Sequence, residues 1–145
     1  MASLSVTKQV LIRASPEVVW RVQTDINSWS QWNRSISVAR TIGPLAVGSS
    51  FEWKSGGFKI ASVIQTLEPV RHMSWTGISI GTDAEHTWTF LPQDGGTLVT
   101  SQESMRGWLV SLLKLLIPRF LDKSLDKWLQ ALKVKSEADS RHPAT

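Results

Sequence analysis

The sequence predicts an α+β fold in which an antiparallel sheet of about seven strands curls around one long C-terminal helix. Between residues 35 and 107, short stretches alternate apolar and polar residues and are separated by turns rich in Gly, Pro and Asp. This pattern is typical of strands linked by hairpins. The chain then ends in its longest apolar helical pattern, residues 107–135, which a curved sheet can pack against. A chain of 145 residues fits one domain.

The N-terminal part is expected to form one strand followed by two short helices. Residues 6–13 alternate in the manner of a strand. Ser15 is a good N-cap and Pro16 a good first helical residue, so a helix should begin there. Asp25 can cap a second short helix.

Six further strands are expected, at residues 35–41, 50–55, 58–69, 72–77, 83–92 and 97–107. The last two are joined by the turn sequence Gln93–Gly96. If this is a four-residue turn, Pro92 pairs with Thr97, and the register then places His86 directly opposite Glu103. A slip of one residue would send Glu103 to the other face.

The C-terminal stretch should be interrupted at Pro118, which removes a backbone donor and clashes with the preceding turn. After Pro118, one apolar face is expected to pack on the sheet, formed by Leu121, Leu125, Trp128, Leu129 and Leu132. Before it, residues 108–117 are apolar nearly all round, which favours an enclosed helix. Residues 138–145 are expected to be a disordered tail.

Composition limits the possible classes of protein. The net charge is +4 and the pI about 9.8, but Lys and Arg are scattered, so we expect no nucleic-acid partner. No Cys is present, which excludes disulfides and thiolate metal sites. The apolar stretch is broken by Lys114 and Pro118, so no stable membrane insertion is expected. We expect a cytoplasmic protein, a monomer or homodimer, without cofactor or metal.

His86 and Glu103 are the candidate catalytic residues, because their apolar companions on each strand direct both side chains inward. A carboxylate favours imidazolium and burial opposes it, so we expect a His tuned near neutrality, suited to a general base. Two alternatives stay open: a buried polar pair that satisfies itself, or a pair that orients a ligand.

Several phrases resemble a known family, namely SPEVVWRVQTDINSWSQWN, FEWKSGG, EHTWTF and GGTLVTSQES followed by GW. They are similar to the polyketide cyclase/dehydrase subgroup of the START and birch-pollen-allergen superfamily, over about residues 6–137. The resemblance implies a helix-grip fold with a deep apolar cavity between the sheet and the long helix. Members bind lipids, sterols, hormones or polyketides, and some are enzymes. The resemblance carries over no catalytic residues.

The preferred hypothesis is binding of a small hydrophobic ligand of lipid, polyketide or aromatic type. One alternative is a cyclase or dehydratase that uses His86 and Glu103, and another is an interaction module that dimerises through residues 108–117. The predicted ligand-binding residues are Trp53, Ser62, Trp75, His86, Trp88, Phe90, Ser101, Glu103, Trp108, Leu112 and Leu116.

Overall fold

The computed structural model describes residues 3–141 and contains one antiparallel sheet. The order of the strands across the sheet is β1-β7-β6-β5-β4-β3-β2. The strands are β1 Ser3–Ile12, β2 Ile36–Ile42, β3 Ser50–Ser55, β4 Phe58–Glu68, β5 His72–Ser79, β6 Thr82–Gln93 and β7 Gly96–Arg106. The helices are α1 Pro16–Thr24, η1 Ile26–Ser28, α2 Trp29–Trp32, α3 Trp108–Leu116 and α4 Phe120–Arg141. The predicted α+β architecture is confirmed.

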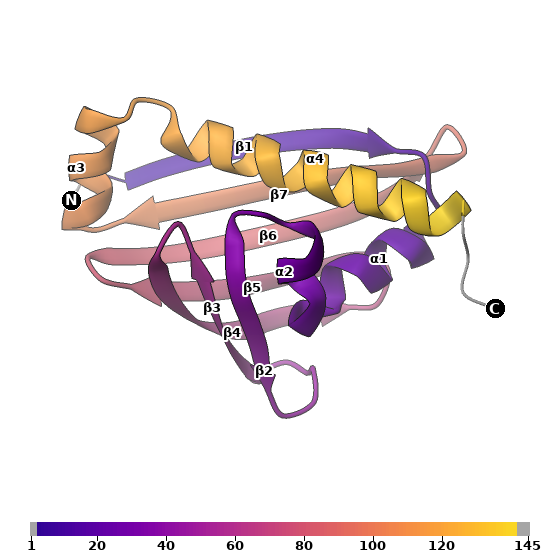
Figure 1. Ribbon diagram of the computed structural model, residues 1–145, viewed down its shortest axis with the longest axis horizontal. Helices are drawn as coiled ribbons and strands as arrows, with labels where there is room; N and C mark the ends of the chain where they lie inside the picture. Colours follow the sequence, from indigo (N-terminus) through magenta and orange to yellow (C-terminus); the bar gives the residue numbers. More distant parts are fainter. Residues whose placement is uncertain (1–2, 142–145) are drawn as a thin grey trace.

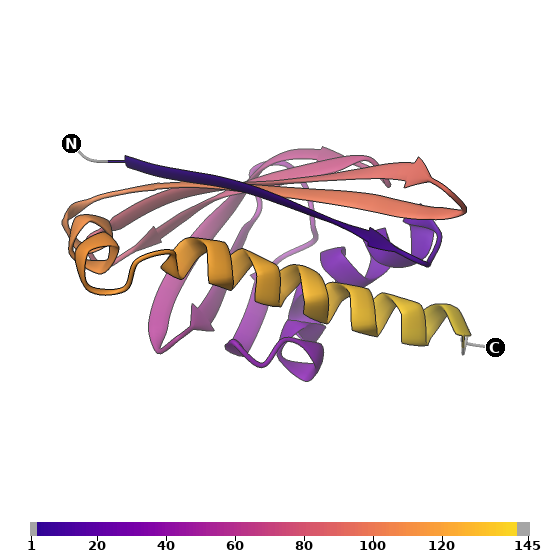
Figure 2. The ribbon, with the colours of Figure 1, turned by 90° about the horizontal axis from the view of Figure 1, so that it is seen from above.

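The sheet curves around α4, which crosses its concave face (Figures 1 and 2). The apolar face of α4 is buried there, as the sequence predicts, with Trp128 and Leu132 in the main hydrophobic core. Trp29 of α2 meets Trp128 edge to face, with ring centroids 5.0 Å apart. The helix α1 packs toward the opposite end of the molecule from α3, and α2 lies between them, so the two ends of the sheet are covered differently (Figure 1).

The hairpin of β6 and β7 has the predicted register. Asp94 and Gly95 both have positive φ, 50° and 77°, as a two-residue turn matched to the twist of the strands requires. Pro92 therefore pairs with Thr97, and His86 lies directly opposite Glu103.

The predicted helix boundaries are confirmed at two positions. Ser15 caps α1 by accepting a hydrogen bond from the backbone N–H of Val18 at 3.3 Å. Pro118 lies between α3 and α4, and the following Arg119 has a φ of 65°, so the chain turns sharply there.

The predicted disordered tail is wrong for residues 138–141, because α4 continues to Arg141. Glu137 accepts a hydrogen bond from the backbone N–H of Arg13 at 2.9 Å, which ties this part of the helix to the end of β1. An i,i+4 ion pair between Lys135 and Asp139, 3.0 Å long, supports the last turns. The rest of that prediction, 142–145, lies outside the described residues.

Candidate functional site

On β5 and β6, the inward-facing side chains become smaller from the pair Met73 and Trp88 toward the pair Ser79 and Thr82. This decrease in size, which we call the taper, creates a cavity. The successive cross-strand pairs on the concave face are Met73 with Trp88, Trp75 with His86, Gly77 with Ala84, and Ser79 with Thr82. The large residues fill the half of the sheet near α1. The small ones leave space near α3, since side chains of their size cannot reach α4.

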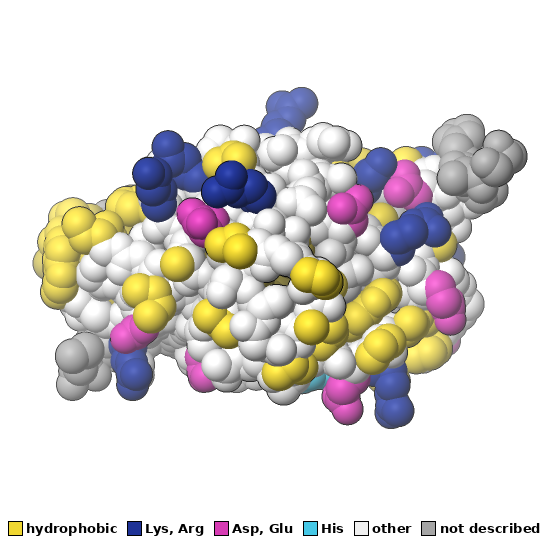
Figure 3. All heavy atoms as spheres, turned by 90° about the horizontal axis from the view of Figure 1, so that it is seen from below, with side chains coloured by type: hydrophobic (Ala, Val, Ile, Leu, Met, Phe, Trp, Pro, Cys, Tyr) yellow, Lys and Arg dark blue, Asp and Glu magenta, His cyan; other side chains and the backbone are white. Residues whose placement is uncertain are grey.

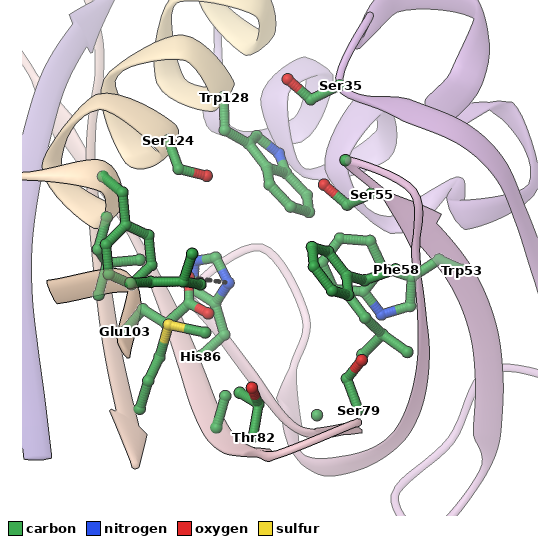
Figure 4. A pocket seen from close by; sticks show the side chains of 18 of the residues that line it. Ser35, Trp53, Ser55, Phe58, Ser79, Thr82, His86, Glu103, Ser124 and Trp128 are labelled. Atoms are coloured by element: carbon green, nitrogen blue, oxygen red, sulfur yellow. Dashed lines mark ion pairs between the residues drawn. The ribbon is translucent and has the colours of Figure 1, made fainter. Parts of the chain in front are cut away.

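A cavity of about 250 Å³ occupies that space. The strands contribute the sheet wall, α4 contributes Phe120, Leu121, Ser124 and Trp128, and α3 contributes Leu109 and Leu113. Figure 4 shows Trp53 and Phe58 on one side of the cavity, His86 with Glu103 on the other, and Trp128 above, between the two groups. The remaining lining residues are Asn33, Ser35, Ser55, Gly56, Ile60, Trp75, Gly77, Ser79, Thr82, Ala84 and Met105.

His86 and Glu103 meet in the cavity wall, on the adjacent strands β6 and β7. The Nδ1 atom of His86 lies 3.6 Å from Oε1 of Glu103, which is longer than a hydrogen bond (Figure 4). The Nε2 atom of His86 is hydrogen-bonded to Oγ of Ser101 at 2.7 Å. The ring also stacks on Trp88, with centroids 4.7 Å apart. The imidazole is thus held on two sides, and Glu103 is left with capacity for another hydrogen bond.

Burial dominates the charge state of this pair. It lowers the pKa of His86 from 6.5 to about 3 and raises the pKa of Glu103 from 4.5 to about 7. The expectation that His86 is tuned near neutrality is therefore wrong, because desolvation outweighs the neighbouring carboxyl. His86 is neutral at pH 7, and Glu103 is the group that exchanges its proton near neutral pH.

The structure brings four of the predicted ligand-binding residues to the cavity wall: Trp53, Trp75, His86 and Glu103. Ser62 and Ser101 lie just behind it, where Ser62 Oγ accepts a hydrogen bond from Nε1 of Trp53 at 2.9 Å and Ser101 holds His86. Trp88 and Phe90 point to the same face but do not line the cavity. Trp88 is covered by Trp128, and Phe90 by Trp20 of α1.

The prediction is wrong for Trp108, Leu112 and Leu116, whose side chains are 63%, 44% and 64% exposed. The helix α3 is rotated so that Leu109 and Leu113 face the cavity instead. The expectation that this helix is enclosed is wrong for the same reason. A sequence that is apolar nearly all round does not reveal which side of the helix faces inward.

Several polar lining residues were not predicted from the sequence, and Asn33 is the most informative of them. Its side chain is buried at the cavity wall, and Oδ1 accepts a hydrogen bond from the backbone N–H of Ser35 at 3.0 Å. Its Nδ2 atom has no hydrogen-bond partner among the described residues. Asn33 follows α2 directly, and only the tertiary fold brings it opposite the sheet, so no local pattern marks it.

Two further findings concern residues 3–141. No three His, Cys, Asp or Glu side chains in this part of the chain form a group that could hold a metal ion. None of its helices is both long enough and apolar enough to cross a bilayer.

Comparison with known proteins identifies the family. The family described as "Polyketide cyclase / dehydrase and lipid transport" matches residues 3–137. The chain belongs to this family. No curated protein matches the sequence.

Several solved structures share the helix-grip fold of this chain. The chain is similar to the ZhuI aromatase/cyclase from Streptomyces sp. R1128, with 11% identity over 95% of this chain and 96% of that one, and a TM-score of 0.83. A START superfamily protein from Mycobacterium smegmatis is 17% identical over 92% and 97%, with a TM-score of 0.78. The protein Ara h 8.0201 is 9% identical over 94% and 99%, with a TM-score of 0.75. At these identities the likeness concerns the fold alone.

Proposed function

We propose that this protein binds a small, mainly apolar and electrically neutral molecule in the cavity between the sheet and α4. The observation that carries the proposal is the chemistry of the cavity wall. Apolar and aromatic side chains form most of it, and its polar groups are hydroxyls, one amide, His86 and Glu103. No Lys or Arg is among the described residues that line it. Such a wall suits an apolar body with one or two hydrogen-bonding groups.

A charged ligand would find poor compensation in this site. A carboxylate would lose its water without meeting a cation, and it would approach the carboxyl of Glu103. An amine would meet only one acidic group, whose proton is retained up to about pH 7 because burial raises its pKa. A carbonyl oxygen, by contrast, can accept a hydrogen bond from protonated Glu103. Nδ2 of Asn33, which has no partner within residues 3–141, offers a second donor.

The volume limits the size of the enclosed part. A cavity of about 150 Å³ is enough for benzene, so about 250 Å³ holds roughly two fused aromatic rings. A longer ligand would extend past the hairpin turns at Gly56 and Thr82, which line the cavity at its α3 end. An aromatic ketone of this size therefore serves as a probe.

Isothermal titration with a naphthyl methyl ketone, a naphthoate and a naphthylmethylamine tests the proposal at pH 7. The ketone should bind at least about tenfold more tightly than either ion. Because Glu103 is the proposed donor to the carbonyl, the substitution Glu103→Ala should weaken ketone binding by about one hydrogen bond, roughly 0.5–1.5 kcal/mol. The matched control Glu85→Gln changes an exposed carboxyl on the neighbouring strand β6 and should leave ketone binding unchanged. Equal or tighter binding of the naphthoate or the amine would refute a neutral ligand.

A second candidate function is acid–base catalysis, favoured by a carboxyl whose pKa of about 7 lies inside a ligand-sized cavity. Ionised Glu103 can remove a proton from the carbon beside a ligand carbonyl, and protonated Glu103 can return it. The neutral ring of His86, with its low pKa, is the weaker base and would position the carboxyl. The similar fold of an aromatase/cyclase supports this candidate only by analogy.

The same ketone separates binding from catalysis. Its methyl protons exchange with deuterium through the enolate or enol, so NMR in deuterium oxide reports directly on removal of a proton from this carbon. An enzyme of this type should accelerate exchange, and Glu103→Gln should reduce the rate ~100-fold or more while the ketone still binds. Exchange no faster than in buffer would leave ligand binding as the function.

A further inference from the structure

The helix α3 has two apolar faces, and only the inner one is used by the cavity. Leu109 and Leu113 line the cavity, and Val110 is buried. The outer face carries Trp108, Leu112, Leu115 and Leu116, at the i, i+4, i+7 and i+8 positions of one helical stripe. We call the exposed set Ile80, Trp108, Leu112, Leu115, Leu116 and Ile117 the α3 patch. Figure 3 shows apolar side chains gathered at this end of the molecule.

The α3 patch is presented in a defined orientation. The backbone N–H of Leu109 donates a hydrogen bond to the carbonyl of Gly81 at 3.1 Å. The indole of Trp108 lies against Gly81, so closely that a side chain at Gly81 would collide with it. The β5–β6 turn therefore holds the start of α3, and Ile80 of that turn extends the patch. An exposed apolar surface in a fixed position marks a contact site.

The charges around the α3 patch are mostly positive. Residues 106–123 contain the four cations Arg106, Lys114, Arg119 and Lys123. The acids beside them are Asp122 and Asp83, which lies opposite Arg106 across β6 and β7. The carboxylate of Asp122 is itself within 3.6 Å of Arg119 and 3.8 Å of Lys8. The patch is thus apolar at its centre, with more cations than acids at its rim.

This combination distinguishes between possible partners. A second copy of the chain, related by two-fold symmetry, would bring the same cations against one another across the interface. An anionic lipid surface matches both features, because the headgroups attract the cations and the acyl region accepts the apolar side chains. A Trp on such a surface is also favoured at the boundary between headgroups and acyl chains.

We propose that the α3 patch docks the protein reversibly on an anionic lipid bilayer, with the outer face of α3 at the headgroup–acyl boundary. Reversible docking of one helical stripe requires no membrane-spanning segment. The inner face of the same helix lines the cavity, so docking would place the cavity beside the bilayer. The proposal does not depend on which ligand the cavity takes.

Vesicle flotation with the full-length chain tests this proposal. The protein should float with vesicles of phosphatidylcholine and phosphatidylglycerol, float much less with phosphatidylcholine alone, and be released by added salt. Replacing Leu115 and Leu116 together by Ser should weaken binding about tenfold or more, since both are largely exposed and insert into the bilayer. Lys114→Glu should weaken it as well.

Matched variants outside the patch serve as controls. Ile42→Ser with Val47→Ser removes two apolar residues that are 53% and 63% exposed around the β2–β3 connection. Lys127→Glu reverses an exposed charge on α4. Both controls should bind vesicles as the unaltered chain does. Far-UV circular dichroism should be the same for all variants.

Three outcomes would overturn the proposal. The unaltered chain could fail to float with anionic vesicles. The control variants could lose binding as strongly as the α3 variants. Light scattering could show a dimer that the Leu115 and Leu116 changes dissociate, without vesicle binding, which would make the patch a self-association surface. Loss of ketone binding would bear on the proposed ligand and not on docking.

Discussion

Replacing Glu103 by Gln should change how the free energy of unfolding depends on pH, because the folded chain holds a proton on the buried carboxyl of Glu103. Burial raises the pKa of Glu103 in the folded chain from 4.5 to about 7. The folded chain therefore keeps this proton up to about pH 7, whereas the unfolded chain loses it near 4.5. Stability contributed by this group is fully present below pH 4.5 and is lost as the pH rises to about 7. The gap between the two pKa values corresponds to about 3 kcal/mol.

In the unaltered chain, this pH dependence of the unfolding free energy is masked, because His86 contributes a dependence of opposite sign. Burial lowers the pKa of His86 from 6.5 to about 3, so unfolding takes up a proton between these values and stability rises with pH there. Between pH 4.5 and 6.5 the two contributions nearly cancel. A flat pH profile of the unaltered chain would therefore not exclude a buried carboxyl.

Gln mimics protonated Glu in shape and charge, so Glu103→Gln removes only the carboxyl's ionisation. Relative to the unaltered chain, the variant should gain about 3 kcal/mol of unfolding free energy between pH 4.5 and 7.5. Urea denaturation at these two pH values measures the gain, with Glu85→Gln as the exposed control. A gain below about 1 kcal/mol would show that Glu103 ionises as a solvated carboxyl, and the acid–base candidate would lose its basis.

Two further predictions concern α3 and α4. Trp128 is buried against Trp29, Trp53 and His86, so Trp128→Ala should cost ~3–5 kcal/mol in a urea melt, and a loss below ~1 kcal/mol would mean that this face is not core. Amide hydrogen exchange should be faster in α3 than in α4, because α3 is exposed on its outer face and is separated from α4 by the sharp turn at Arg119. Equal protection of the two helices would show that the exposed outer face does not lower the local stability of α3.

The pairing of His86 with Glu103 could be predicted because a local signal determines it. The Asp94–Gly95 turn fixes the register of β6 and β7, and the alternation of apolar residues fixes the face. The pKa values could not be predicted in the same way. They depend on how completely α4 and the neighbouring aromatic rings cover the pair, which the two strands alone do not reveal.

The sequence also could not show which of the inward-facing residues line the cavity. Trp88 and Phe90 share the inward face with His86, and a period of two residues assigns all three to one side. Which of them reaches the cavity depends on the helices: Trp20 of α1 covers Phe90, and Trp128 covers Trp88. On α3, where no polar stripe marks the outer side, the pattern could not separate Leu109 from Trp108.

The taper along β5 and β6 explains why the polar pair lies where it does. His86 and Glu103 occupy the step between the filled half of the sheet and the half lined by Gly77 and Ala84. A ligand that enters past the turn at Thr82 therefore meets His86 and Glu103 at the inner end of its path. Its carbonyl or hydroxyl end would lead and would lie beside this pair. Its apolar remainder would then lie against the inner face of α3, beside Leu109 and Leu113. One helix thus contacts the apolar end of the ligand on its inner face and, in the proposed docking, the acyl region of a bilayer on its outer face. An apolar ligand could pass between these two environments around α3 with little exposure to water, which accounts physically for a helix that is apolar nearly all round.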